Sequence, residues 1–283
     1  MENITRRSIL EKLGLAGAGG VFGNLLTPAK SDARPKKADA FALIGDRWHN
    51  FDFIRTAMKR IFVDEAGISV DFTAEVTDLS AERLKGYKLF ILLCDGMSFP
   101  GGYNSPYVFV EKDTKIVSEP AVKIDEKSKM WMTGEQGKAI KEFVQKGGGA
   151  LFYHNASYIS SDNKDFRDVE GALFTGHTEF RPYKMKIVRN DHPITKDVND
   201  FIVTEEQHFL IYDKDPKDVL IRSINEQGLT YKEYGSTCEA CWAYDYGKGR
   251  VSFMTPGHTI ASMWNPEYIK LQQNAARWLM KQS

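Results

Sequence analysis

The chain has 283 residues, which is enough for a sizeable core in one large domain or two small ones. Lysine plus arginine and aspartate plus glutamate number 38 each, so the formal net charge is zero. This balance argues against a general nucleic-acid binder, which would carry a basic excess or stripe. The hydrophobic share of 42% and the charged share of 27% are ordinary for a soluble globular protein.

The first 33 residues differ from the rest of the chain. Arg6 and Arg7 precede a short, glycine-rich apolar stretch over residues 13–26, and small residues follow it. This order is typical of a bacterial twin-arginine export signal and predicts a periplasmic protein. The stretch is shorter than the about 20 apolar residues of a membrane-spanning helix, and no later segment is long and apolar enough to span a bilayer. The alternative interpretation is a disordered amino-terminal tail.

Strand and helix patterns alternate between residues 40 and 155. The segment 89–94 is uninterrupted apolar sequence, as expected of a central parallel strand that is covered on both faces. Such alternation predicts an α/β protein with a right-handed, doubly wound parallel sheet. The predicted strands are 40–45, 68–72, 89–94 and 149–153, and the predicted helices are 52–66, 80–86 and 133–146.

The remaining segments complete one predicted domain over residues 38–283. A long irregular stretch, 97–132, is rich in glycine and proline, and we expect a loop or small hairpin over the carboxyl edge of the sheet. The second half is richer in strand signals and closes with a helix over 266–281. Its predicted strands are 180–188, 200–203, 218–224, 243–246 and 250–255, the last two forming a hairpin.

Three of the six histidines follow predicted buried strands. His49 follows the strand 40–45, His154 ends the strand 149–153, and His258 follows the last predicted strand. Open, mostly parallel sheets bind ligands in the crevice beyond the carboxyl ends of their strands, so we expect these imidazoles to share one site. Three protein ligands and a water are the usual shell of a catalytic zinc ion, which predicts a divalent metal. The alternative is that the histidines bind substrate hydroxyls or brace loops.

Other residues at the same edge are candidates for catalysis and substrate binding. Asp46 and Asp95 follow strands and suit a general acid or base or a hydroxyl-binding carboxylate, with loop capping as the alternative. Glu206 is a candidate fourth ligand or general base, and His177 either faces the site or holds a turn. Aromatic faces often bind sugars, although core or rim packing is the alternative. The further substrate-binding candidates are Arg47, Trp48, Tyr103, Tyr153, Tyr158 and His208.

The cysteines and glycines exclude two kinds of site. Cys94 lies in an apolar strand and is expected to be a small buried hydrophobe. Cys238 and Cys241 form a lone C-x-x-C, which is open to a disulfide, to part of a zinc site or to coincidence, and the absence of a second C-x-x-C argues against a structural zinc site with four cysteines. There is no G-x-G-x-x-G after the first strand, so no nucleotide cofactor is predicted.

Five short motifs occur in order along the chain: Gly147-Gly-Gly-Ala-Leu-Phe-Tyr-His154, Leu173-Phe-Thr-Gly-His177, His192-Pro-Ile-Thr195, Glu205-Glu-Gln-His208 and Tyr246-Gly-Lys-Gly-Arg-Val followed by Gly257-His-Thr259. Together they resemble the ThuA-like (trehalose utilisation) family. The resemblance covers most of residues 40–280 and implies a flavodoxin-like fold, related to the class I glutamine amidotransferase domain. It also implies a link to the catabolism of sugars, particularly of glycosides oxidised to 3-keto forms.

The chain departs from the amidotransferases at the turn where they carry a cysteine nucleophile. His154 stands there, and no Cys, Ser or Thr follows until Ser157, so thiolate chemistry is excluded at that place. A second departure concerns the acidic pair that precedes a tyrosine in the family. Here Glu205 and Glu206 are followed by His208 at the tyrosine position.

These observations predict an exported enzyme that hydrolyses, eliminates or isomerises a glycoside or 3-keto-glycoside, with a divalent metal such as zinc. The alternative is a non-catalytic periplasmic carbohydrate-binding protein that uses the same crevice. A third possibility is a structural subunit of a larger saccharide-processing complex. Expected partners are a small carbohydrate and a second copy of the chain, and no nucleic acid.

Overall fold

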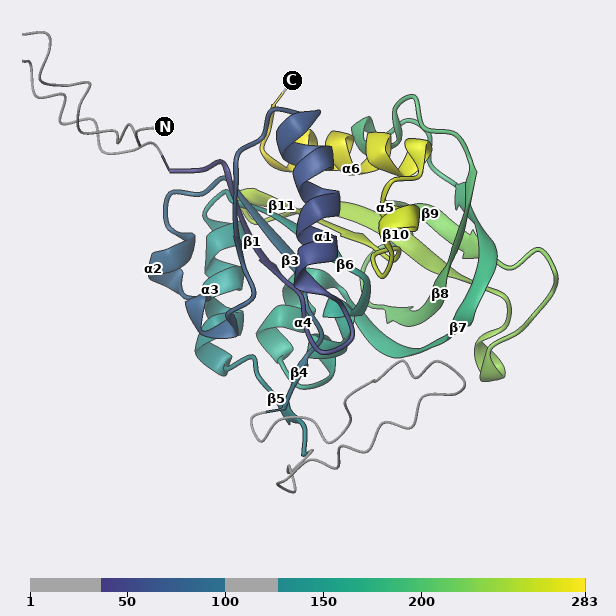
Figure 1. The fold of residues 1–283 in the computed structure, drawn as a ribbon, viewed down its shortest axis with the longest axis horizontal. Helices are drawn as coiled ribbons and strands as arrows, with labels where there is room; N and C mark the ends of the chain where they lie inside the picture. The colour runs from purple at the N-terminus through teal and green to yellow at the C-terminus, as the bar shows by residue number, and fades with distance from the viewer. Residues whose placement is uncertain (1–36, 100–126, 283) are drawn as a thin grey trace, which may run out of the picture. The chain divides into compact units, whose positions relative to one another are not determined.

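A nine-stranded sheet organises the fold in the order β2-β1-β3-β6-β11-β10-β9-β7-β8 (Figure 1). The computed structural model describes residues 37–99 and 127–282. The first five strands are parallel: β2 (Val70–Thr73), β1 (Ala40–Ile44), β3 (Leu89–Leu93), β6 (Gly149–Tyr153) and β11 (Gly249–Met254). The other four run antiparallel to their neighbours: β10 (Thr237–Tyr246), β9 (Val219–Ile224), β7 (Ala172–Ile187) and β8 (Phe201–Tyr212).

Apolar side chains on both faces explain why the central strands are buried. Successive residues of a strand point to opposite faces, so a strand that is covered on both sides needs an apolar side chain at every position. In β1, Ala40, Ala42 and Ile44 belong to one hydrophobic core, whereas Phe41 and Leu43 belong to the other. The sequence prediction of a mainly parallel sheet with helices on both faces and a β-rich carboxyl-terminal half is therefore confirmed.

Two groups of helices cover the two faces of the sheet (Figure 1). The first group is α1 (Phe51–Met58), its π-helical continuation η1 (Lys59–Asp64), α5 (Ile260–Met263) and α6 (Pro266–Leu279). The second group is α2 (Ala81–Leu84), α3 (Gly134–Gln145) and α4 (Lys164–Glu170). Short 3₁₀ helices are η2 (Val76–Asp78), η3 (His154–Ser161), η4 (Pro193–Thr195), η5 (Pro216–Asp218) and η6 (Lys232–Tyr234). None of the helices in the described part of the chain has the length and apolar character needed to cross a membrane.

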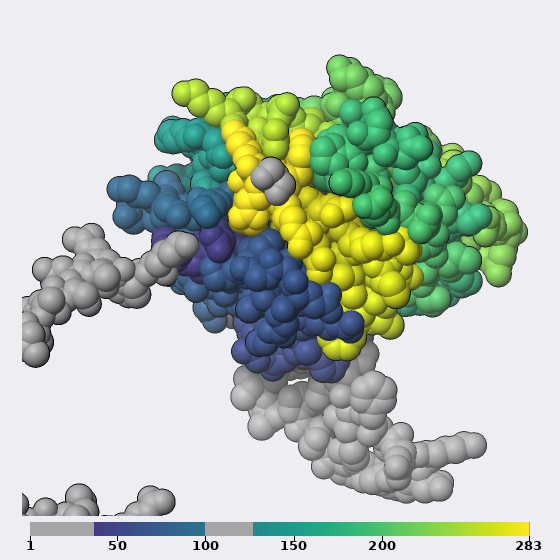
Figure 2. Space-filling view, turned by 90° about the horizontal axis from the view of Figure 1, so that it is seen from above, coloured from purple at the N-terminus to yellow at the C-terminus, as the bar shows by residue number. Residues whose placement is uncertain are grey.

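The carboxyl-terminal helix packs against the first helix and its continuation. Figure 2 shows the yellow surface of α6 beside the blue surface of α1 and η1. Gln273 donates a hydrogen bond to the Ile61 carbonyl at 3.1 Å, and the Trp264 indole donates to the Ala57 carbonyl at 3.4 Å. These contacts join segments that are about 200 residues apart in sequence, and they hold the loop after β1 near the loop after β11.

Several element predictions need correction in extent. β7 begins eight residues before the predicted strand 180–188, and β8 continues nine residues beyond the predicted strand 200–203. The helices η3 and α4 directly follow β6 and were not predicted. The capping box predicted at Thr133 is present, because its hydroxyl accepts from the Gln136 amide while the Gln136 side chain accepts from the Thr133 amide.

The cysteine pair does not form a disulfide. Cys238 and Cys241 are both buried free thiols. Their side chains belong to the two different cores, on opposite faces of the sheet, which keeps the sulfur atoms apart. Burial raises the pKa of each thiol to about 12, so neither is a thiolate at neutral pH.

The insertion after β3 has its two ends together. β4 (Met97–Ser98) pairs antiparallel with β5 (Lys129–Met130), as expected at the base of a hairpin. The Trp131 indole donates to the Asp95 carbonyl at 2.6 Å and ties the returning chain to the carboxyl end of β3. The predicted substrate-binding residue Tyr103 and the predicted export signal, residues 1–33, lie outside the described residues.

Candidate active site

The structure brings His49, His154 and His258 together at the carboxyl ends of β1, β6 and β11. The centroid of the His49 ring lies 4.9 Å from that of His154 and 4.5 Å from that of His258, and the His154 and His258 centroids are 5.4 Å apart. One nitrogen of each ring lies within 4.8 Å of the others. This spacing suits a single cation bound between the three rings.

Hydrogen bonds orient two of these rings so that one nitrogen of each ring is left without a hydrogen bond and faces the other histidines. His49 Nδ1 donates to the Asp46 carboxylate at 2.8 Å, and His154 Nδ1 donates to the Thr255 carbonyl at 2.8 Å. The Nε2 atoms of both rings are buried and have no hydrogen-bond partner. Metal-binding histidines show this arrangement, because a proton held at one nitrogen leaves a lone pair on the other.

Hydrogen bonds from other protein groups occupy the Asp46 carboxylate, which corrects its predicted role in substrate binding. Its carboxylate accepts from the backbone amides of Trp48 and Asp95, both at 2.7 Å, as well as from His49. Burial opposes ionisation, but the hydrogen bonds led by His49 keep the pKa of Asp46 below its usual value. Asp46 is therefore a buried carboxylate that orients His49 and fixes the ends of β1 and β3.

Glu206 is the carboxylate that faces the histidines. Its Oε2 lies 3.4 Å from His154 Nε2, 3.2 Å from His258 Nδ1 and 3.9 Å from His208 Nε2, and its Oε1 lies 3.6 Å from His177 Nδ1. Burial of Glu206 disfavours the charge, but the surrounding imidazoles lower the pKa of its carboxyl far below the usual range. Glu206 thus offers a charged oxygen to the same space as the bare nitrogens.

His208 adds a further imidazole, and it is fully buried. Neither of its ring nitrogens has a hydrogen-bond partner, and its ring centroid lies 4.1 Å from that of His154. His154, Glu206 and His208 form a second set of possible ligands within 4.8 Å of one another. Burial lowers the pKa of both His154 and His208, which favours the neutral imidazole that metals bind.

The turn that carries His154 has an unusual backbone conformation. His154 has a φ of +51°, a left-handed value that few residues other than glycine adopt and that is frequent at functional sites. A Cβ on Gly257 would lie 2.8 Å from the His154 Cβ, so the loop before His258 reaches its place only because residue 257 is glycine. Both loops are thus packed to set the two imidazoles side by side.

Sequence reasoning missed Glu205 as a positioning residue. Its side chain is fully buried, and its Oε1 accepts from the backbone amides of His258 at 2.8 Å and Thr259 at 3.1 Å. This carboxylate ties β8 to the loop after β11 and so fixes His258 beside Glu206. The signal for it was the acidic pair that Glu205 forms with Glu206, but a role in the site was predicted for Glu206 alone.

Asp95 faces the cavity beside Asn155, a residue that was not predicted. The Asp95 Oδ1 accepts from the Met97 amide at 2.7 Å, and Asn155 Nδ2 donates to Asp95 Oδ2 at 3.2 Å. Burial raises the pKa of Asp95 to about 6, so its carboxyl can gain or lose a proton near neutral pH. Asn155 follows His154 directly, and that position was the signal for it.

The imidazoles of the site other than His154, together with the carboxyl groups of Asp95 and Glu206, line a cavity of about 390 Å³. Aromatic side chains form part of its wall: the Tyr158 ring packs edge-on against Phe174 at 5.8 Å, and Phe174 lies 5.2 Å from His208. Polar groups beside aromatic faces are typical of small-molecule sites. The lining residues are Trp48, His49, Asp95, Met97, Asn155, Tyr158, Phe174, His177, Glu206, His208 and His258.

Two predicted substrate-binding residues take other positions. Tyr153 is fully buried in the core that α6 covers, where its hydroxyl donates to Gln272 at 3.2 Å. The residue after it, His154, enters the site, and neighbouring positions of a strand point to opposite faces. The Arg47 guanidinium stacks on the Trp48 ring, 4.7 Å from its centroid, and Arg47 does not line the cavity.

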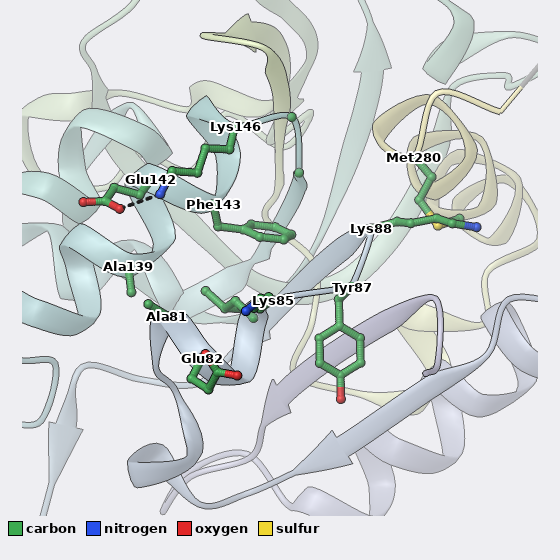
Figure 3. Close-up of a pocket in the computed structure, with 14 residues that line it drawn as sticks. Ala81, Glu82, Lys85, Tyr87, Lys88, Ala139, Glu142, Phe143, Lys146 and Met280 are labelled. Carbon is green, nitrogen blue, oxygen red and sulfur yellow. Dashed lines mark hydrogen bonds and ion pairs between the residues drawn. The ribbon is translucent and has the colours of Figure 1, made fainter. Parts of the chain in front are cut away.

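A larger hollow of about 640 Å³ lies at the opposite, amino-terminal edge of the sheet (Figure 3). It lies between α2 and α3, beside Tyr87, Phe143 and Met280. Lys146, which also lines it, pairs with Glu142 at 2.8 Å. No histidine or buried carboxylate lines this hollow, so the chemistry of the described residues is concentrated in the smaller cavity.

Comparison with known proteins identifies one family. Residues 34–279 match the family model ThuA, described as trehalose utilisation. No curated protein sequence matches the chain.

Solved structures with the same fold include two ThuA-like proteins. The protein from Bacteroides uniformis ATCC 8492 is 17% identical with a TM-score of 0.61, over 89% of this chain and 94% of that one. The protein from Parabacteroides merdae ATCC 43184 is 18% identical with a TM-score of 0.60, over 87% and 90%. A β-galactosidase from Bacillus circulans sp. alkalophilus is 10% identical with a TM-score of 0.52, over 85% of this chain but 31% of its own length. At these identities the similarity establishes the fold.

Proposed function

This chain belongs to the ThuA family, and we propose that it is a carbohydrate-processing enzyme that acts on a glycoside or 3-keto-glycoside with a divalent metal ion, most simply zinc. One observation carries the proposal. The Nε2 atoms of His49 and His154 are buried without a hydrogen bond from the protein, the charged carboxylate of Glu206 lies 3.4 Å from His154 Nε2, and His49 and Glu206 line the same cavity. Buried polar nitrogens without partners are costly, and a cation would satisfy them.

His49, His154 and His258 would hold the ion, with Glu206 as a fourth ligand or as a general base. A bound divalent ion supplies a Lewis acid for a sugar carbonyl or an acidified water. Asp46 and Glu205 keep His49 and the His258 loop in place. His208 lies beside His154, where it suits a ligand or a hydrogen-bond partner of the substrate.

Asp95 and His177 are the proposed acid–base residues. Both line the cavity, and Asp95 has a pKa of about 6, which suits proton transfer near neutral pH. His177 Nδ1 lies 2.8 Å from the Thr178 carbonyl and 3.6 Å from Glu206, so the ring is held at the edge of the cavity. Hydrolysis, elimination and isomerisation of a sugar each include a proton transfer close to a sugar oxygen. Asp95 and His177 are acid–base groups that can carry out this transfer.

Elemental analysis of protein purified without a histidine tag tests the metal. We expect about one equivalent of zinc or another transition metal in the wild-type chain, and a trace in His154→Ala and His258→Ala. These variants should also lose at least about 10²-fold in turnover of glycosides or 3-keto-glycosides. His192→Ala is the matched control, because His192 lies at a turn against Trp278 and does not line the cavity. Wild-type metal content and turnover in both site variants would refute the proposal.

A non-catalytic carbohydrate-binding protein is the second candidate, favoured by the aromatic wall of the cavity. It would bind sugar with no metal and no turnover. The same purified protein separates the two, since sugar binding without stoichiometric metal supports the binder.

We also propose export by the twin-arginine route, from Arg6 and Arg7 and the apolar stretch that follows them. Fractionation of cells that produce the full chain, with Arg6→Lys/Arg7→Lys as the comparison, tests it. Export predicts periplasmic wild-type protein and retention of the double variant in the cytoplasm; equal distribution of the two contradicts it.

A further inference from the structure

The cavity of the candidate active site has exposed aromatic side chains at its rim. This cavity of about 390 Å³ lies at the small end of the about 300–1,000 Å³ typical of ligand cavities. A glycoside has a second group attached to its sugar, and when the sugar lies against the histidines that group extends toward the rim. The side chains at the rim therefore influence which glycosides bind. This inference rests on the proposed carbohydrate function.

Trp48 presents an open aromatic surface at the rim. It stands beside His49 in the loop after β1 and lines the cavity, yet 43% of it is exposed. The Arg47 guanidinium, 4.7 Å from the ring centroid, stacks on the indole and orients it. A large apolar ring that is oriented and still half exposed has surface available for a ligand.

Phe180 presents a second exposed ring next to the same histidines. It comes from β7, and its ring packs edge-on against His258 with the centroids 4.9 Å apart, while 45% of the residue is exposed. The pairing of β7 with β8 is irregular between His177 and Phe180. Such bulges redirect side chains and are frequent next to active sites.

The two exposed rings adjoin neighbouring histidines. Trp48 is next to His49 in sequence, Phe180 contacts His258, and the His49 and His258 centroids are 4.5 Å apart. We propose that Trp48 and Phe180 form a subsite for the second ring of a glycoside, while the histidine-lined cavity takes the first ring. The class of ligand is therefore a glycoside with at least two rings rather than a free monosaccharide.

Binding measurements with a series of sugars that have one or two rings test the subsite. Calorimetry or saturation-transfer NMR on the full-length protein would compare glucose with trehalose, maltose, cellobiose and lactose. We expect at least one disaccharide to bind about tenfold more tightly than glucose, as the contact of one further ring with aromatic surface would give. In Trp48→Ala and in Phe180→Ala the ratio of disaccharide to glucose affinity should fall toward one.

Conservative and remote variants separate the subsite from a general loss of fold. Trp48→Tyr and Phe180→Tyr keep an aromatic face and should keep most of the preference for two rings. Phe53→Ala removes an aromatic side chain that is 62% exposed on α1 and lines no part of the cavity, so it should leave the ratio unchanged. Thermal melting of each variant confirms that it is folded.

Either of two results would overturn the subsite: no disaccharide in the series binds more tightly than glucose, or the preference survives both alanine substitutions. Failure of the proposed enzyme is a different result, because it shows as missing metal and missing turnover. A metal-free protein that still prefers two rings would retain the subsite in a carbohydrate-binding protein.

Discussion

Asp46 acts on the candidate active site through His49. Its carboxylate is almost entirely buried and accepts hydrogen bonds from the His49 ring, from three backbone amides and from Asn155, so no lone pair is left for a sugar hydroxyl. A carboxylate hydrogen-bonded to a metal-binding imidazole fixes the tautomer and raises the basicity of the ring. The sequence placed Asp46 correctly at the end of a strand. Its hydrogen bond to His49, which only the structure shows, determines that it orients this ring.

Substitution of Asp46 by asparagine should weaken metal binding without removing a ligand. Loss of the charge that holds the proton on His49 Nδ1 predicts a fall of about 10–100-fold in zinc affinity. Competition with a chromophoric chelator measures it. Asp52→Asn, at an exposed carboxylate of α1 that pairs with Arg55, is the control and should leave the affinity unchanged. Equal affinities in the two variants would remove Asp46 from this role.

The loop after β11 depends on the close approach of Gly257 to two neighbouring side chains. Gly257 lies against His154 Cβ and Leu93, with 2.8 Å and 3.1 Å to the place where a Cβ would stand. Such distances leave no room for a methyl group between β3, β6 and this loop. The glycine in the Gly-His-Thr motif is therefore required by packing, whereas its histidine is required by the site.

Gly257→Ala should destabilise the protein by about 1–3 kcal/mol, the usual cost of overpacking, and should displace His258 from Glu206. Chemical denaturation measures the first effect and metal content the second. Gly134→Ala is the matched control, for which we expect an increase in the free energy of unfolding instead of a decrease. Residue 134 begins α3, a Cβ there meets nothing within 4 Å, and alanine favours a helix by up to about 1 kcal/mol. A stable Gly257→Ala with full metal content would contradict the packing argument.

At the scale of the whole molecule, one buried carboxyl outside the active site couples stability to pH. Glu170 ends α4 with its side chain fully buried, where its Oε2 accepts from Ser160 and from the Ala172 amide, both at 3.0 Å. Burial raises the pKa of Glu170 to about 8. The ionisable groups that surround it are Arg167, Asp213, Tyr212 and Tyr244.

Because the folded state binds the Glu170 proton more tightly than the unfolded state, this residue stabilises the fold at acid pH. The contribution is full below the unfolded pKa of about 4.3 and falls as the pH rises through about 8, by about 1.4 kcal/mol for each pH unit between the two values. Glu170→Gln should flatten the dependence of the free energy of unfolding on pH between 5 and 9. Glu142→Gln, on the surface of α3, should not; an unchanged slope in Glu170→Gln would contradict the burial argument.

The sequence by itself determined the parts of the fold that local patterns encode. Uninterrupted apolar segments identified β1, β3 and β6, helical spacing identified α1 and α6, and the capping box identified the start of α3. Because parallel strands end at one edge, the same reasoning predicted that His49, His154 and His258 would meet, and the structure places their rings within 5.4 Å of one another. These inferences need only the periodicity of side chains and the chirality of β-α-β connections.

The tertiary structure alone showed how residues of the antiparallel half reach the site. Glu206 and His208 reach the site because β8 pairs with β7 at the far edge of the sheet and the strands curve back toward the ends of the parallel strands. That pairing is a long-range contact, as are those that turn Tyr153 into the core and bury the Asp46 carboxylate. A sequence pattern fixes which residues share a face of a strand, but which partner covers that face depends on contacts between residues distant in the chain.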